Sequence, residues 1–290
     1  MKENNMVFKK YLLPLLGCVS FVFASDPVTL DSMFQNQQGL RSITTFQTLS
    51  SGNANTFATY PDLVAVDEGK YYQDVKIFSV TQTFLYDITQ KFDALVSANG
   101  SIKRKEYYDF FDGYGHQNTT EFDSLWVGGT YSFDAIDDFK PYLTLQASLY
   151  QKEHYLDSTK NTYANSYSAK LAFRNYSDPV ISTLYVGTMY NRAKEIAGYK
   201  VENGNVFSAG LDFSIILSPK IALDLGAEQR YQTETKIDGV AYSNAAAIST
   251  MTIGATYSMS SKNSLSISSS IGGSSKSPDS IFSVSLWHKF

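Results

Sequence analysis

Residues 204–232 read GNVFSAGLDFSIILSPKIALDLGAEQRYQ. Apolar residues occupy alternate positions in both halves of this stretch, and small or charged residues occupy the positions between them. Because successive side chains of a β-strand point to opposite faces, the pattern predicts two strands, each with one apolar and one polar face. Ser218, Pro219 and Lys220 are turn-forming residues and predict a tight hairpin between the two strands.

The same alternation recurs along most of the chain and predicts twelve strands. They span about residues 40–50, 73–86, 93–106, 122–134, 141–153, 163–176, 180–193, 204–217, 220–234, 246–259, 263–272 and 280–290. Short connections alternate with longer polar ones, which we place at about 51–72, 107–121, 154–162, 194–203, 235–245 and 273–279. Strict alternation of this kind is typical of an outer-membrane barrel, with short periplasmic turns and longer outside loops.

Alternation alone does not distinguish a soluble sandwich from a membrane barrel, because the apolar face could form a core or meet lipid. Aromatic residues cluster near the expected strand ends, as they do in the girdles of membrane barrels. The final stretch SIFSVSLWHKF alternates and ends on Phe290, which resembles the C-terminal signal read by the barrel-assembly machinery, although His288 departs from it. We therefore expect an all-β fold, a transmembrane antiparallel up-and-down β-barrel of about 12 strands, located in the bacterial outer membrane.

The first residues predict an export signal. Lys9 and Lys10 precede a short apolar stretch, and Ala24 completes a small-residue cleavage pattern. We expect a signal peptide over 1–24, a periplasmic leader or plug helix over 25–39 and the barrel over 40–290. A lipoprotein box at Cys18 is the alternative for the signal, and a disordered leader is the alternative for the helix.

Composition excludes several classes of function. The formal net charge of −4 argues against a nucleic-acid-binding protein, and no apolar run is long enough for a membrane-spanning helix. Phosphate-binding, dinucleotide-binding, zinc-protease and hydrolase motifs are absent from the sequence, so we expect no enzyme, no catalytic residue and no cofactor. His116 and His154, with Asp109, Asp112 and Glu121 near the first, suggest either a surface metal site or solvated loops, and we expect no metal.

Charged residues also fall on the polar faces of the expected strands, which would line the lumen of a barrel. These candidate lumen-lining residues are Lys103, Lys170, Arg174, Asp212, Asp224, Glu228 and Arg230. Basic residues on one set of strands and acidic residues on another could form opposed walls with a transverse field across a pore. Alternatively, the charges pair with one another and fill the lumen.

Three stretches carry a narrower resemblance. They are VTQTFLYDITQKFDALVSANGSIKR at 80–104, SPKIALDLGAEQRY at 218–231, and the chain from GATYSMSS at 254 to the end. Together they resemble the bacterial MetA-pathway-of-phenol-degradation family of outer-membrane barrels. The resemblance covers residues 73–290 and implies a channel or transporter for passive or facilitated passage of small solutes, aromatic or apolar compounds among them.

A structural or surface-interaction barrel is the second hypothesis, because Tyr107, Tyr108, Phe110 and Phe111 form an aromatic patch that could bind a partner. The expected contacts are outer-membrane lipid and lipopolysaccharide, the assembly machinery and a small-molecule solute, with no nucleic acid. The basic run at 103–105 could hold lipopolysaccharide phosphates or form a solvated rim.

Overall fold

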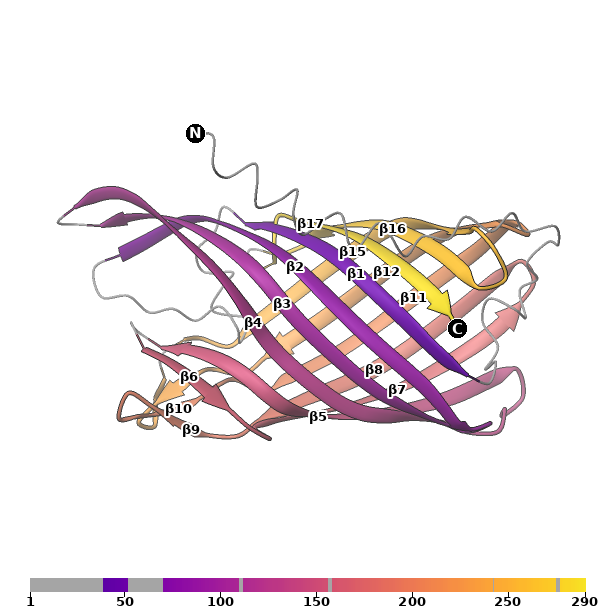
Figure 1. Ribbon diagram of the computed structural model, residues 1–290, viewed down its shortest axis with the longest axis horizontal. Coiled ribbons are helices and arrows are strands. Elements are labelled where there is room, and N and C mark those ends of the chain that lie inside the picture. Colours follow the sequence, from indigo (N-terminus) through magenta and orange to yellow (C-terminus); the bar gives the residue numbers. More distant parts are fainter. Residues whose placement is uncertain (1–38, 52–69, 110–111, 156–157, 242, 275–276) are drawn as a thin grey trace.

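A computed structural model describes residues 39–51, 70–109, 112–155, 158–241, 243–274 and 277–290. The regular structure of these residues consists of β-strands (Figure 1). No helix in the described part of the chain is long and apolar enough to cross a membrane. The predicted signal peptide and the leader up to residue 38 lie outside the described residues.

Twelve strands form one closed antiparallel ring, as predicted. In ring order they are β1 (Leu40–Ser51), β2 (Lys70–Thr89), β3 (Phe92–Asp109), β4 (Gly113–Ser132), β5 (Phe139–Tyr155), β7 (Ser166–Ser177), β8 (Val180–Asn191), β11 (Val206–Ser218), β12 (Ile221–Gln232), β15 (Ala246–Ser258), β16 (Asn263–Gly272) and β17 (Ser280–Lys289). β1 pairs with β17 and closes the ring, and the N–H of Phe290 donates to the carbonyl of Leu40 over 3.1 Å. The ring therefore leaves no unpaired sheet edge among these strands.

Among the described residues, five short strands lie at one end of the ring. β6 (Ser158–Thr162) pairs with the end of β5, while β9 (Lys194–Ile196), β10 (Tyr199–Glu202), β13 (Lys236–Ile237) and β14 (Val240–Ala241) form a separate four-stranded sheet. These strands lie in the predicted long connections, so we call this end the long-connection end. Figure 1 shows β6, β9 and β10 together at this end.

The prediction of a long loop over 107–121 is wrong. β3 continues to Asp109 and β4 begins at Gly113, so the two strands form a hairpin that projects past the rest of the barrel (Figure 1). Thr and Tyr are frequent in this segment and favour extended backbone. Gly113 has a φ of +79°, which a glycine adopts without strain at the tip of the hairpin.

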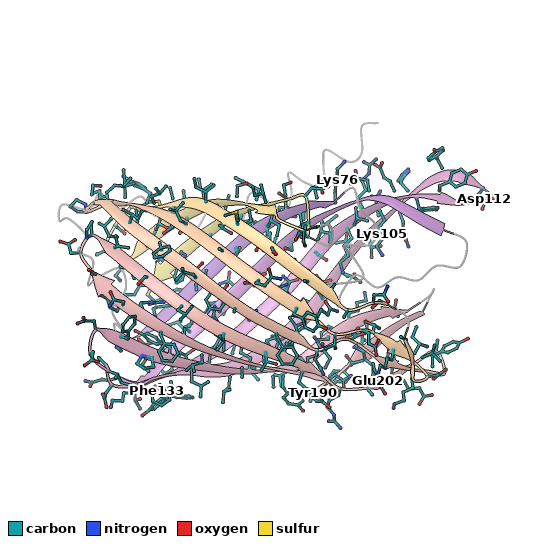
Figure 2. The ribbon with its side chains drawn as sticks, turned by 180° about the vertical axis from the view of Figure 1, so that it is seen from behind. Lys76, Lys105, Asp112, Phe133, Tyr190 and Glu202 are labelled. Carbon is teal, nitrogen blue, oxygen red and sulfur yellow. The ribbon has the colours of Figure 1, made fainter. Side chains whose placement is uncertain are left out.

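The opposite end carries the short turns predicted from the sequence, and we call it the short-turn end. Lys91, in the turn between β2 and β3, forms an ion pair of 2.7 Å with Asp134, which lies between β4 and β5. This hydrogen bond raises the pKa of Lys91 above its usual value. Figure 2 places Phe133 toward this end and Asp112 and Glu202 at the other.

The outer face of the barrel is apolar. Large exposed side chains alternate along single strands, such as Leu184 and Val186 on β8 or Met251 and Ile253 on β15. Exposed aromatic residues concentrate near the ends of the strands. They include Phe84, Tyr86, Phe92, Tyr131, Phe133 and Phe139 toward the short turns, and Phe122, Tyr163, Tyr190 and Tyr231 toward the long connections. This distribution matches a lipid-facing band between two aromatic girdles.

Candidate functional site

The inner face of the barrel can be identified from a side-chain contact between two strands that are not direct neighbours. Tyr185 on β8 donates its hydroxyl to Glu228 on β12 over 2.7 Å, although β11 lies between these strands. Side chains converge in this way on the concave face of a curved sheet and diverge on the convex face. The alternation along each strand then assigns the neighbouring inward residues.

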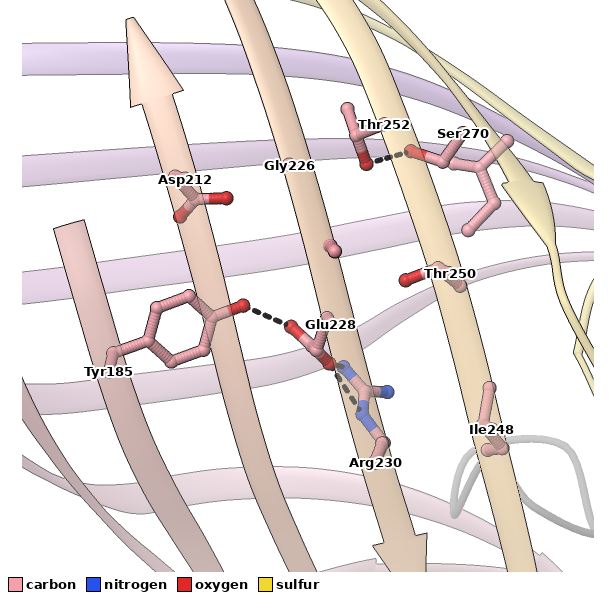
Figure 3. Close-up of a pocket in the computed structure, with 11 residues that line it drawn as sticks. Tyr185, Asp212, Gly226, Glu228, Arg230, Ile248, Thr250, Thr252 and Ser270 are labelled. Atoms are coloured by element: carbon pink, nitrogen blue, oxygen red, sulfur yellow. Dashed lines mark hydrogen bonds and ion pairs between the residues drawn. The ribbon is translucent and has the colours of Figure 1, made fainter. Parts of the chain in front are cut away.

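The inward residue Glu228 is held from two sides. Tyr185 donates to one carboxylate oxygen, and Arg230 forms an ion pair with the other over 3.0 Å. Figure 3 shows the three side chains joined in this order along the wall. The arrangement neutralises the charge of Glu228 and fixes the Tyr185 ring across β11.

A second inward carboxylate lies nearer the short-turn end of β12. Asp224 accepts hydrogen bonds from Ser214 over 2.6 Å and from Thr256 over 2.7 Å. The Thr256 hydroxyl also lies 2.8 Å from that of Ser266, so one network crosses β11, β12, β15 and β16. Hydroxyl donors on both sides of the carboxylate hold it in place without a cation.

Cations line the neighbouring wall. Lys170 on β7 places its Nζ atom 3.7 Å from the centre of the Tyr185 ring, and Arg174 lies 5.2 Å from the centre of the Tyr142 ring. Both positions are those of cation–π interactions. Lys170 and the inward Asp212 on β11 remain exposed to solvent although they point into the barrel. The interior is thus wide enough at this height for water to reach both charges.

A recess of about 190 Å³ opens between these groups on the inner wall (Figure 3). Tyr185, Asp212, Glu228 and Arg230 supply its charged and phenolic side. Its remaining lining comes from β12, β15, β16 and β17 and consists of Gly226, Ala227, Ile248, Thr250, Thr252, Ser270 and Ile281. The recess is therefore polar on one side and carries two isoleucines on the other.

An apolar strip continues from this recess along the inner wall. Leu49 and Val75 are buried against each other, with Ile77 and Ile281 packed against them. Leu49 is the register partner of both Ile77 on β2 and Ile281 on β17, which places these side chains on one face. Ile281 belongs to both the strip and the recess, so the two features are continuous.

Hydroxyl pairs cover the part of the interior formed by β15, β16, β17, β1, β2 and β3. Direct pairs join Thr252 to Ser270 over 2.7 Å, Thr45 to Ser285 over 2.9 Å and Thr83 to Ser97 over 2.9 Å. Cross-strand pairs of this kind stabilise a sheet without charge. Between the two ends of the barrel, the interior accordingly has one side with neutral hydroxyl pairs and one side with charged residues.

Ion pairs occupy the interior at both ends. At the short-turn end, Arg41 on β1 bonds to Asp87 on β2 and, over 2.9 Å, to Asp93 on β3. The two carboxylates are register partners, and their side chains are 2 % and 8 % exposed. Two acidic groups held this close in a buried site depend on the shared guanidinium.

A matching cluster lies toward the long-connection end. Lys103 donates to Glu121 and Asp123 over 2.8 Å each, and all three side chains are buried. Lys152 adds an ion pair of 3.2 Å to Glu121. On β5, Glu153 pairs with Lys194 of β9, which ties a short strand to the ring.

The seven residues predicted to line the lumen fall into two groups. Lys170, Arg174, Asp212, Asp224, Glu228 and Arg230 lie on β7, β11 and β12, whereas Lys103 lies on β3 in the cluster just described. The expected opposition of a basic and an acidic wall is wrong, because only β8 separates β7 from β11 in the ring. The basic and the acidic strands are therefore adjacent in the ring and not opposite each other.

Sequence reasoning missed several inward residues. Tyr185 and Tyr142, which position the cations, alternate with outward apolar residues and could have been found by that signal. The Arg41 cluster had no such signal, since its members come from three strands. Within the described residues, no group of three His, Cys, Asp or Glu side chains is arranged to hold a metal.

Comparisons with known proteins support the architecture. An outer membrane channel from Pseudomonas putida F1 matches with a TM-score of 0.63 and 13 % identity, covering 93 % of this chain and all of that one. The transport unit of the autotransporter AIDA-I from Escherichia coli matches at 0.55 with 12 % identity, covering 88 % and 91 %. The NanC porin matches at 0.52 with 7 % identity, covering 86 % and 100 %.

No family model matches the sequence, and no curated protein matches it. At these identities the structural likenesses establish the fold, a single-chain barrel of the outer-membrane type. The function has to be argued from the side chains inside the barrel.

Proposed function

We propose that this chain is an outer-membrane channel through which small solutes pass along the interior of the barrel. The observation that carries the proposal is the solvent exposure of Lys170 and Asp212, two charged residues that point inward at mid-wall. A barrel filled by its own side chains would bury such groups and pair them. The apolar outer band and aromatic girdles suit the lipid of a bacterial outer membrane.

In this orientation the short turns face the periplasm and the long connections face outside, next to lipopolysaccharide. β17, together with Phe290 that follows it, is the segment that the barrel-assembly machinery would read. The apolar strip from Leu49 to Ile281 supports aromatic or apolar compounds among the solutes, in line with the resemblance to the phenol-degradation family.

Conductance of the refolded protein in a planar bilayer tests this proposal. Discrete current steps are expected from single barrels. Replacing Lys170 and Arg174 with Glu should shift the reversal potential in a salt gradient toward cation selectivity, because both residues line the path. A correctly folded barrel without current would contradict the channel, and an unchanged reversal potential in the variant would contradict a path along Lys170 and Arg174.

The projecting β3–β4 hairpin favours a second function, attachment of a partner at the cell surface. Tyr108 and Tyr114 form an edge-to-face pair with centres 5.1 Å apart on this hairpin, and Tyr114 is 79 % exposed. Replacement of residues 106–116 by a short turn would abolish partner binding and leave conductance intact if both functions reside in one barrel.

A further inference from the structure

Most cations that point into the barrel are neutralised by carboxylates. The pairs are Arg41 with Asp87 and Asp93, Lys103 with Glu121 and Asp123, Lys194 with Glu153, and Arg230 with Glu228. Lys140, Lys170 and Arg174 on the β5–β7 wall differ, since none of them has a carboxylate oxygen within 4.0 Å among the described residues.

These three cations are also crowded. Lys140 on β5 is the direct register partner of Arg174 on β7, and like charges in directly opposite positions destabilise a sheet. Both lie over the same ring, with Lys140 Nζ 5.6 Å and Arg174 Cζ 5.2 Å from the centre of Tyr142. The tyrosine holds the cations toward the interior and offers only a weak counter-charge.

The acidic groups on the adjoining wall do not balance this charge. Glu228 is neutralised by Arg230, and Asp224 is held by two hydroxyl groups. Asp212 is the remaining carboxylate, and it lies beyond ion-pair distance of Lys170 and Arg174. Counted together with Arg230, the cations in this part of the wall number four and the carboxylates three, so one positive charge is in excess.

The neighbouring recess is mainly polar, but it has room for one ring and presents the Tyr185 ring, Ile248 and Ile281 to it. Its volume of about 190 Å³ is similar to that of an engineered cavity of about 150 Å³ that binds benzene in another protein. Lys170 contacts the Tyr185 ring that forms one side of the recess, and Ile248 and Ile281 form another. An apolar body in the recess would place an attached acidic group next to the cations.

We propose that Lys140, Lys170 and Arg174, together with the recess beside Tyr185, form a binding site for a small organic monocarboxylate whose apolar body is about one aromatic ring in size. The carboxylate occupies the place of the missing counter-ion, and the apolar body lies toward Ile248. The inference deepens the proposed function, because it assumes that solutes travel along this interior.

Benzoate is the probe, and benzyl alcohol is its neutral counterpart of the same size. Isothermal titration calorimetry on the refolded barrel in detergent should show benzoate binding at least about tenfold more tightly than the alcohol, since charge-assisted hydrogen bonds are lost. The variants Lys170→Gln and Lys170→Gln/Arg174→Gln should each weaken benzoate binding, the double variant by about tenfold or more. Asp212→Asn should tighten it, because a repulsive charge is removed.

Lys262→Gln is the matched control, since this exposed lysine lies in the short turn between β15 and β16. Loss of benzoate binding in this control, or equal binding of benzoate and benzyl alcohol, would overturn the monocarboxylate site. Heat-dependent gel mobility verifies that each variant is folded. The single Lys170→Gln variant keeps the test valid if the double variant does not fold.

Bilayer recordings separate this inference from the proposed function. Current steps without any benzoate binding would support the channel and contradict the monocarboxylate site. Benzoate binding without current steps would support the site and contradict the channel. Binding together with partial block of the current by millimolar benzoate is the expected result.

Discussion

Gly210 lies directly beneath the ring of Tyr185. A Cβ atom on residue 210 would come 2.3 Å from both the ring carbon Cζ and the hydroxyl oxygen. The two residues are register partners on β11 and β8. Because residue 210 has no side chain, the Tyr185 ring can cross β11 and donate its hydroxyl to Glu228 on β12. The face of the same ring contacts Lys170.

Gly210→Ala should displace this ring. We expect a loss of about 1–3 kcal/mol in the free energy of unfolding, as for other overpacked sites, and weaker benzoate binding. Unfolding by urea in lipid vesicles measures the first effect and calorimetry the second. Tyr185→Leu in the same chain should relieve the clash, so additive effects of the two changes would contradict this contact.

Lys140→Gln should stabilise the barrel, because it removes a like charge opposite Arg174. The expected gain is about 0.2–1 kcal/mol, the usual range for a cross-strand pair. Urea unfolding at low salt measures it, and the gain should shrink at high salt as the charges are screened. Lys140→Arg keeps the charge and serves as the control, so a similar gain in that variant would exclude repulsion as the cause.

Arg41→Gln should destabilise the short-turn end of the barrel. Asp87 and Asp93 would lose their shared cation while remaining buried, at an expected cost of about 3–5 kcal/mol. Arg104→Gln is the matched control, because its pair with Glu106 is exposed and should contribute at most about 1 kcal/mol. Similar losses in the two variants would show that burial of the Arg41 cluster has no energetic role.

Ile253→Arg and Thr252→Arg test the assignment of faces on β15. Ile253 is 59 % exposed on the outer face, so the first variant should cost about 2–4 kcal/mol of stability in a bilayer. Thr252 lines the interior recess, so the second should fold and alter conductance. The reverse pattern, with Thr252→Arg disrupting insertion, would mean that the strand faces the other way.

Both tryptophans of the chain point inward. Trp126 is the register partner of the interior residue Ser97, and Trp287 is the partner of Ser264 on the serine face of β16. Acrylamide in the aqueous phase should therefore quench their fluorescence in vesicles, and brominated lipid tails should have little effect. Strong quenching by the lipid would place at least one indole on the outer face.

The strands were predictable because their signal is local. The predicted strand at 263–272 coincides with β16, and the alternation at 204–232 correctly separated Phe207 on the outer face from Asp212 on the inner wall. The overlong β3–β4 hairpin was missed because Asp109, Asp112 and Gly113 interrupt its aromatic residues, so the segment resembles a loop and shows no regular alternation.

The partners of the interior charges were not predictable, because register between strands is not encoded locally. Lys103 meets Glu121 and Asp123 through an irregularity at which the pairing passes from Ser124 to Phe122 and skips Asp123. Simple alternation does not reveal where such a bulge lies. The separation of cations from carboxylates by β8 likewise follows from ring order.

The division of the interior into dissimilar sectors has a consequence for stereochemistry. Cations project into the interior from β5 and β7, carboxylates project from β11 and β12, and paired hydroxyl groups project from β15 and β16. A solute that touches all three sectors at once meets a handed surface, and its mirror image can satisfy only two of them. A passage built in this way can sort enantiomers while both are moving through it.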